Sequence, residues 1–203
     1  MIVPSGSPTV SPKLSRPEHV GDRPGLLGAT ILTRSGLYFD FLDPQPDQIS
    51  VEDIAHALSQ ICRFGGHSQR FYSVAQHCVL VSRIVPPEHA FAGLMHDAAE
   101  AYVGDIPSPL KQLLPDFKVI EARVEAAVAA KFGLSTPWSE EVKRADLIAL
   151  STEQRDVRKN RDPRGLDAFP PLATLISPVS PVSARALFLQ RFQALAFKRE
   201  RAA

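Results

Sequence analysis

The sequence predicts an all-α fold, a compact helical bundle, and three observations support this prediction. From about residue 50 onward, apolar residues recur at the three- and four-residue spacing of amphipathic helices. Most of these helical stretches end at a Pro or Gly break, which separates each from the next. Hydrophobic residues make up 44% of the 203 residues, so a single domain of this length can bury a substantial core.

The first part of the chain departs from the helical pattern. Residues 1–25 are rich in Pro and Ser and lack periodicity, which predicts a flexible arm ahead of one domain at 26–203. Two β-like runs, 31–33 and 37–41, flank a short polar turn. These runs are expected to pair as a small β-hairpin near residues 30–42.

Helical segments fill the rest of the chain, and local signals mark several of their ends. Ser50 and Ser73 are followed three residues later by Asp53 and Gln76, which is typical of an N-terminal cap. The third segment is expected to end at a rigid, Pro-containing loop, 105–111. The segments are expected at about 50–61, 73–85, 90–103, 117–132, 140–159 and 183–199.

Charge and cysteine content narrow the class of protein. A formal net charge of +1 gives no sign of a surface for nucleic-acid polymers or membranes. No run approaches the roughly 18 apolar residues of a membrane span. Cys62 and Cys78 lie within helical patterns and are expected to be free thiols, which favours a reducing compartment. Because residues 1–6 lack a signal-peptide pattern, a cytoplasmic location is expected.

The third helical segment contains the polar residues on which the functional prediction depends. Placed on a helix, His96, Asp97 and Glu100 fall on the arc opposite the apolar stripe. A solvated face would carry Lys, Arg or Gln, but none occurs between residues 88 and 110. Buried acids are costly unless something positive compensates them. A bound divalent cation is therefore the simplest explanation, and an adjacent His–Asp pair suits one.

The candidate metal ligands are His77, His96, Asp97 and Asp146. They come from three helical segments, and each lies on or beside the core side of its helix. Two imidazoles and two carboxylates leave open positions on one six-coordinate divalent ion, for which Mn, Co, Ni, Fe, Zn and Mg are all compatible. The alternatives are a hydrogen-bonded core histidine for His77, and an ion pair with Arg144 or Arg155 for Asp146.

Residues near this set are candidates for proton transfer and for substrate binding. Glu100 is one helical turn from the His–Asp pair, and Asp105 lies just past the end of that helix. The alternative for Asp105 is a structural role in its loop. The candidate substrate contacts are Arg63, Phe64, His67 and Lys111. Arg63 and Lys111 suit phosphate oxygens, and the alternative for both is a solvated loop cation. The ring of Phe64 suits a stacked base.

The order of these residues resembles a known superfamily pattern. His77, then His96-Asp97, then Asp146 resembles the H…HD…D pattern of the HD-domain phosphohydrolase superfamily. The branch that the chain resembles most holds bacterial 5′-deoxynucleotidases and phage HD-type dATP triphosphohydrolases, and the likeness covers roughly residues 30–160. The stretches that carry it are RFGGH (63–67), YSVAQH (72–77), LMHDAAE (94–100) and GDIPSP (104–109).

This resemblance implies an all-helical HD-domain fold, one divalent metal held by the four candidate ligands, and hydrolysis of nucleotide phosphates. By motif position it implies catalytic roles for Glu100 and Asp105, and a phosphate or sugar contact for Arg63. Relatives with two metals need additional histidines before the last Asp, and no histidine follows His96, so one metal is favoured. Relatives are commonly dimers or larger, so a homo-oligomer is expected.

The expected function is therefore that of a metal-dependent phosphohydrolase acting on nucleotides, with deoxynucleoside 5′-phosphates as the favoured substrates. The motifs leave monophosphate and triphosphate substrates open, because the same metal site serves both. The alternative is a nucleotide-sensing regulatory domain of the HD type with little turnover. Glu100 and Asp105 argue against that alternative, because a sensor needs no groups for proton transfer.

Overall fold

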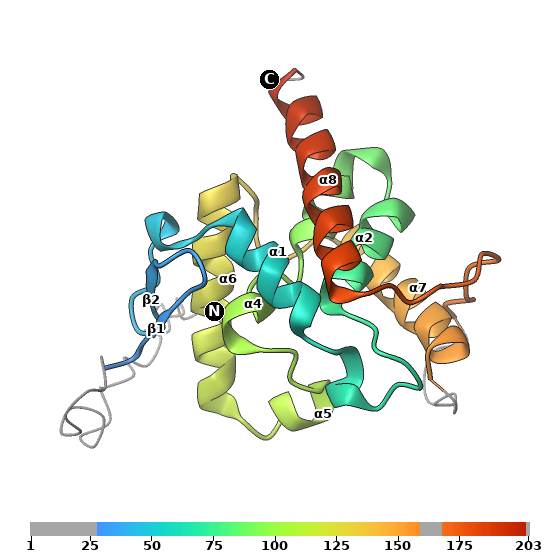
Figure 1. Ribbon diagram of the computed structural model, residues 1–203, viewed down its shortest axis with the longest axis horizontal. Coiled ribbons are helices and arrows are strands. Elements are labelled where there is room, and N and C mark those ends of the chain that lie inside the picture. Colours follow the sequence, from blue (N-terminus) through green and yellow to red (C-terminus); the bar gives the residue numbers. More distant parts are fainter. Residues whose placement is uncertain (1–27, 159–167, 202–203) are drawn as a thin grey trace, which may run out of the picture.

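The computed structural model describes residues 28–158 and 168–201, and this part of the chain is mostly helical (Figure 1). The all-α prediction and the small hairpin are both confirmed, whereas the arm predicted at 1–25 lies outside the described residues. The strands are β1 Thr30–Leu32 and β2 Tyr38–Asp40. The α-helices are α1 Val51–Gln60, α2 Val74–Ile84, α3 Ala90–Met95, α4 Glu100–Val103, α5 Ser108–Lys111, α6 Pro115–Phe132, α7 Glu140–Asp156 and α8 Pro181–Glu200.

The hairpin is attached to the bundle at its turn and along one face. The strands are antiparallel, with Ile31 opposite Phe39. In the turn, the backbone N–H and the hydroxyl of Ser35 both donate to the carboxylate of Asp53 in α1, at 2.8 and 2.5 Å. The buried ring of Phe39 stacks on Tyr102 of α4, with 4.0 Å between the ring centres. These contacts extend the core beyond the helices.

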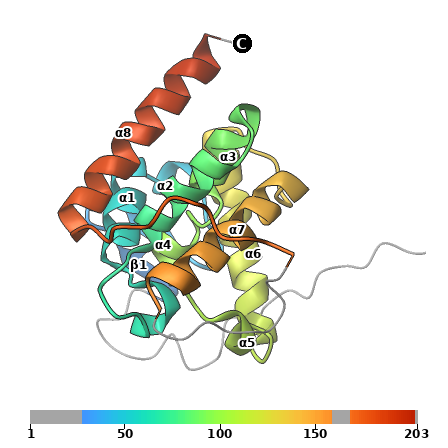
Figure 2. The same cartoon turned by 90° about the vertical axis from the view of Figure 1, so that its right-hand side faces the viewer.

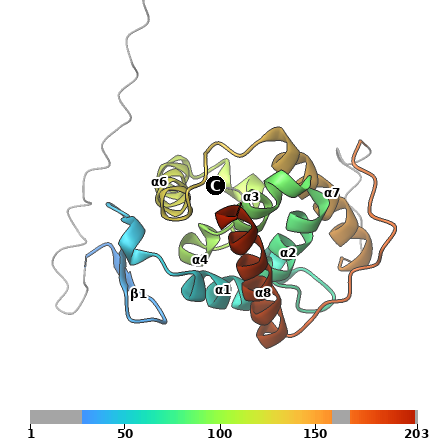
Figure 3. The ribbon, with the colours of Figure 1, turned by 90° about the horizontal axis from the view of Figure 1, so that it is seen from above.

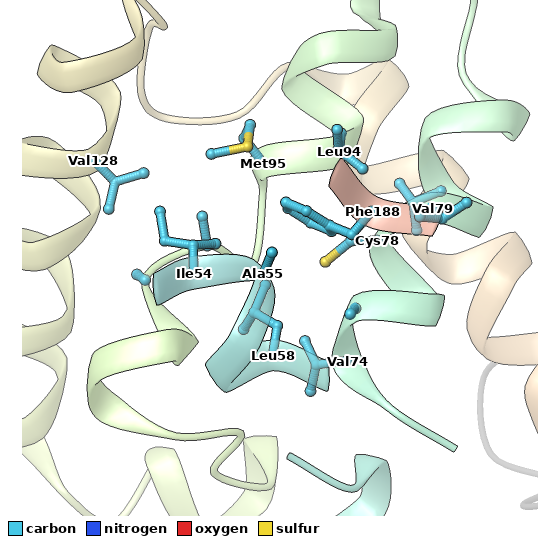
Figure 4. Packing of buried hydrophobic residues seen from close by; sticks show 14 of the residues in the cluster. Ile54, Ala55, Leu58, Val74, Cys78, Val79, Leu94, Met95, Val128 and Phe188 are labelled. Atoms are coloured by element: carbon cyan, nitrogen blue, oxygen red, sulfur yellow. The ribbon is translucent and has the colours of Figure 1, made fainter. Parts of the chain in front are cut away.

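The core of the bundle lies where α1, α2 and α3 meet α8. Seen from above, α8 lies across α1 and α2 (Figure 3), and its C-terminal end extends away from the body (Figure 2). The predicted final helix therefore packs on its own bundle. The side chains that meet in this core are apolar and without exposed surface, and each contributes about 1.5–3 kcal/mol when fully buried. They include Ile54, Leu58, Val74, Cys78, Leu94, Met95 and Phe188 (Figure 4).

The start of α2 is partly as predicted. The hydroxyl of Ser73 accepts a hydrogen bond from the backbone N–H of Gln76 at 3.2 Å, which caps the helix. The Gln76 side chain does not complete the capping box that the sequence suggests. Its amide instead donates to the carbonyl of Ser177 at 2.8 Å and accepts from the N–H of Val179 at 3.0 Å. Gln76 therefore fastens the extended segment before α8 to the side of α2.

The predicted continuous helix at 90–103 is wrong, because the chain forms two short helices, α3 and α4, around a tight turn. In this turn, Ala98 N–H donates to the Met95 carbonyl and Glu100 N–H donates to the Asp97 carbonyl, both at 3.0 Å. These three-residue hydrogen bonds wind the backbone more tightly than an α-helix does. Gly104 ends α4 with a positive backbone angle, φ 83°. Glycine adopts this conformation without steric cost because it has no Cβ atom.

The loop predicted at 105–111 contains a short helix, α5, whose first turn tolerates proline because the early N–H groups have no helical partner. The following helix, α6, buries Val124 and Val128, whereas Val119 and Ile120 are only half-buried. Among the helices in the described ranges, none has both the length and the apolar character that crossing a bilayer requires.

Candidate metal centre

The four predicted ligands converge on one point inside the bundle. The Nε2 atoms of His77 and His96 are 3.3 Å apart, and Oδ2 of Asp97 lies 3.3 Å from each of them. Oδ1 of Asp146 lies 3.2 Å from Nε2 of His77 and 4.0 Å from Nε2 of His96. An ion with bonds of about 2.1 Å places neighbouring ligand atoms about 3 Å apart and opposite ones about 4 Å apart. These five spacings are compatible with ligands of one divalent ion, and the ligand atoms of His77, His96 and Asp146 all lie within 4.8 Å of one another.

Two helices and one turn hold these side chains. His77 lies in the first turn of α2 and has no exposed surface. His96 and Asp97 are consecutive residues in the turn between α3 and α4, and the tight winding there lets both reach the cluster. Asp146 lies in the middle of α7, and its side chain is 40% exposed rather than part of a fully buried stripe. The cluster is therefore closed on the α2 side and open beside α7.

The ion-pair alternative for Asp146 is wrong. The guanidinium of Arg144 lies over the ring of Phe169, 5.8 Å from its centre. Arg155 donates to both carboxylate oxygens of Asp156, at 2.6 and 2.8 Å. Neither arginine compensates Asp146, whose partners are the two imidazoles.

Hydrogen bonds fix both imidazoles with Nε2 toward the cluster. Nδ1 of His96 lies 3.0 Å from the carbonyl of Gly93, which can only accept, so Nδ1 carries the proton. Nδ1 of His77 lies 2.6 Å from Oε1 of Glu153, a fully buried residue of α7. A carboxylate or carbonyl behind an imidazole in this way orients metal-binding histidines. Both nitrogens of His77 have hydrogen-bond partners, as the alternative of a hydrogen-bonded core histidine also predicts.

The sequence analysis missed Glu153. Its only signal is its position seven residues after Asp146, two turns along the same side of α7. The pKa of Glu153 is lowered, because the charges of His77 and Arg63 outweigh the effect of burial. Glu153 is therefore a buried carboxylate that supports a ligand rather than a ligand itself.

The side chain of Arg63 is mostly buried, although the residue was predicted as a substrate contact in a loop. It lies in the 3₁₀ turn Arg63–Gly66, and Nη2 donates to Glu153 at 3.3 Å. Nη1 lies 3.7 Å from the carboxylate of Asp97 and 3.9 Å from that of Asp105. Burial alone would lower the pKa of Arg63, but these carboxylates outweigh it and raise the pKa well above its usual value. Arg63 therefore organises the acidic groups of the site.

The electrostatics of the cluster favour a positive charge at its centre. Despite its burial and the nearby Arg63, the pKa of His77 is raised well above its usual value by Glu153, Asp146 and Asp97. The pKa values of Asp97 and Asp146 are lowered although both groups are desolvated, because the imidazoles stabilise their charged forms. A proton on His77 or a bound cation satisfies the same demand. The donor set, two imidazoles and two carboxylates, suits a first-row divalent ion.

A pocket of about 610 Å³ opens beside the cluster and is lined by Asp97, Asp146 and all six of the other predicted site residues. Glu100 is buried at the pocket wall, and its Oε2 atom has no hydrogen-bond partner within the described ranges. Burial raises the pKa of Glu100 well above its usual value, and Asp97 and Asp105 raise it further. Burial also raises the pKa of Asp105. The two predicted proton-transfer residues thus face one space. The other four lining residues predicted from the sequence are Arg63, Phe64, His67 and Lys111.

The other three predicted substrate contacts differ in how the structure holds them. Lys111, at the end of α5, forms ion pairs with Glu121 of α6 and with Glu100. Phe64 has a left-handed backbone, with φ 59° and ψ 28°, a conformation that costs a non-glycine residue about 1–2 kcal/mol. His67 is exposed at the rim of the pocket. Lys111 is therefore positioned by protein carboxylates, whereas Phe64 and His67 line the opening.

Cys78 also lies beside the cluster, a position that its place in the sequence did not predict. The Cys78 sulfur and the ligand atoms of His96 and Asp97 all lie within 4.8 Å of one another. Cys78 is a free, fully buried thiol, as expected for both cysteines. Burial and nearby carboxylates raise its pKa, which keeps the sulfur protonated and makes it a weaker ligand than its neighbours.

These observations define a mostly helical protein with a buried His/Asp cluster that can hold a metal ion. No family model matches the chain. It is 47% identical over 175 residues to the uncharacterized protein YfdR of Escherichia coli, an alignment that covers 81% of this chain and 94% of YfdR. It is 33% identical over 137 residues to the uncharacterized protein RCAP_rcc00048 of Rhodobacter capsulatus, covering 61% of this chain and 70% of that protein. The chain belongs to the same family as YfdR.

Proposed function

We propose that this protein is a metal-dependent phosphohydrolase of the HD-domain type that acts on deoxynucleoside 5′-phosphates. The observation that carries the proposal is the meeting of His77, His96, Asp97 and Asp146 beside a pocket that contains the unpaired carboxylate oxygen of Glu100. A divalent ion held by the four ligands would lower the pKa of a water molecule and polarise a phosphate oxygen. The order of the ligands along the chain, H…HD…D, supports the same class.

Glu100 and Asp105 are proposed to move protons. In the protein alone, burial and the neighbouring carboxylates favour the protonated form of Glu100. A cation at the cluster acts in the opposite direction, because a nearby positive charge lowers a carboxyl pKa. The unpaired Oε2 can then accept a proton from the attacking water. Asp105, whose pKa is also raised by burial, can hold a proton for the departing oxygen.

Arg63 and Lys111 are proposed to hold the substrate in place. The distances from Nη1 of Arg63 to Asp97 and Asp105, 3.7 and 3.9 Å, are longer than direct hydrogen bonds. This nitrogen therefore keeps donors for a phosphate oxygen while its charge remains near the carboxylates. Lys111 adds a second cation on the α5 side of the pocket.

The test is release of phosphate, pyrophosphate or tripolyphosphate from deoxynucleoside mono-, di- and triphosphates, with products resolved by chromatography and with Mn²⁺ or Co²⁺ added to metal-stripped protein. Asp97→Ala is expected to abolish release, and Glu100→Gln to reduce it by about 100-fold or more. Glu88→Gln, at an exposed position outside the pocket, is the control. Saturable nucleotide binding without release from any substrate would overturn the proposal and favour the sensing domain.

A further inference from the structure

The outer part of the pocket contains an arrangement of which the proposed hydrolysis uses only Arg63. Two guanidinium groups lie against the ring of Phe64: Cζ of Arg63 is 5.4 Å from the ring centre, and Cζ of Arg158 is 5.2 Å from it. Phe64 is held in its left-handed conformation at this point. Strained backbone in a residue that lines a pocket is typical of a functional position.

The three guanidinium and ammonium groups of the pocket differ in their partners. Arg63 is surrounded by Glu153, Asp97 and Asp105, and Lys111 is paired with two glutamates. For Arg158, no carboxylate within the described ranges lies at ion-pair distance, and its contact is the Phe64 ring. Among the described residues, Arg158 is thus the pocket arginine or lysine without an ion-pair partner.

Arg158 also lies at a distance from the metal cluster. The pocket is lined by residues at four-residue intervals along α7, the last of them just past the end of the helix. They are Asp146, Leu150, Gln154 and Arg158. Three such intervals separate the backbones of Asp146 and Arg158 by about 18 Å. The charged groups are closer than this, because Arg158 and Arg63 lie on the same Phe64 ring and Arg63 reaches Asp97. A ligand that meets both the cluster and Arg158 must therefore span this chain of contacts.

We propose that Arg158 binds a second anionic group of the substrate, and that the substrate is therefore a deoxynucleoside polyphosphate rather than a monophosphate. That the bound nucleotide is hydrolysed rests on the proposed function. The binding of a second anionic group by Arg158 does not depend on hydrolysis. A guanidinium matches phosphate oxygens in a bidentate manner and stacks on an aromatic ring at the same time. A nucleobase stacked on Phe64 and Arg158 is the competing occupant, and inorganic tripolyphosphate distinguishes the two because it has no base.

The test measures equilibrium binding by calorimetry in the Glu100→Gln background, which limits turnover. The probes are a deoxynucleoside triphosphate, the matching monophosphate and inorganic tripolyphosphate, each with the same free Mn²⁺. Arg158→Ala is expected to raise the Kd of the triphosphate and of tripolyphosphate about tenfold, and by several times more than that of the monophosphate. Arg158→Lys should recover part of the loss. Arg144→Ala, which removes another arginine stacked on a phenylalanine but outside the pocket, is the control.

Three results would overturn the inference: no change in Kd, equal losses for monophosphate and triphosphate, or a loss for nucleotides without a loss for tripolyphosphate. The last of these would assign Arg158 to the base. The outcome is separable from the proposed function. If wild-type protein releases neither phosphate nor tripolyphosphate from any nucleotide but the selective effect of Arg158→Ala is seen, the hydrolase proposal fails and the anion site stands. If phosphate is released and the selective effect is missing, only the inference about Arg158 fails.

Discussion

Oε1 of Glu153 lies 2.6 Å from Nδ1 of His77, and neither side chain has any exposed surface. This contact joins α7 to α2, so that one helix supplies a candidate ligand, Asp146, and also orients a second one. Because Glu153 is bound to Arg63 as well, the positions of the cluster and of the pocket wall depend on each other. The buried carboxylate of Glu153 therefore both orients a candidate metal ligand and holds α2 and α7 together.

Replacing Glu153 with Gln is expected to weaken metal binding. The amide keeps the shape but loses the charge that orients His77 and compensates Arg63, and such supporting contacts are worth about 10–100-fold in metal affinity. The measurement is the Kd of Mn²⁺ for metal-stripped protein. Glu140→Gln, an exposed change on the same helix, is the control. A Glu153→Gln protein that is folded and binds Mn²⁺ with unchanged affinity would show that the contact does not support the metal site.

Replacing Gln76 with Ala is expected to loosen the segment that precedes α8. The change removes one hydrogen bond to Ser177 and one from Val179, and each is worth about 1 kcal/mol. Denaturant unfolding measures the loss, and hydrogen exchange at the Val179 amide reports it locally. Gln190→Ala, at an exposed position of α8, is the matched control. Equal protection of the Val179 amide in both variants would contradict this role for Gln76.

Asp156 is expected to make stability depend on pH in the acidic range. Its pKa is lowered mainly by the hydrogen bonds from Arg155, with a smaller contribution from the Ile176 N–H, against the effect of burial. A lowered folded-state pKa contributes stability that is fully present above the unfolded value, about 3.9, and is lost as pH falls through the folded value.

The check is to compare wild type with Asp156→Asn. Their free energies of unfolding are expected to differ by about 1 kcal/mol at neutral pH, and the gap should shrink as the pH falls below about 4. Chemical unfolding across this range measures it. A gap that stays constant or widens with acidification would contradict the assignment of the lowered pKa to Asp156.

Much of the fold follows from local signals that are visible in the sequence. Ser50 and Ser73 cap α1 and α2, and the hairpin forms between the two β-like runs. The break between α3 and α4 has no such signal, because the residues there are ordinary helix formers and the turn depends on packing. The sequence also suggests a reciprocal bond for Gln76, but a carbonyl 101 residues away competes successfully for its amide.

The candidate cluster was predictable from the order H…HD…D and from the small or apolar surroundings of His96 and Asp97, where an isolated acid would be costly. The burial argument does not extend to Asp146, whose side chain is 40% exposed. Glu153 and Arg158 were not predictable, since their roles depend on residues far away in the chain. Glu153 acts through His77, 76 residues before it, and Arg158 is recognisable only by its place on Phe64. The seven-residue spacing from Asp146 places Glu153 on the same side of α7 but does not show that it contacts His77.

The most direct test of the central claim is a titration of metal-stripped protein with Mn²⁺, followed by electron paramagnetic resonance. One saturable ion per chain is expected in the wild type. Asp97→Ala should lose that ion, whereas Asp116→Ala, which removes an exposed acid from α6, should keep it. The absence of a saturable site, or a site that persists unchanged in Asp97→Ala, would contradict the assignment of this cluster as a metal centre.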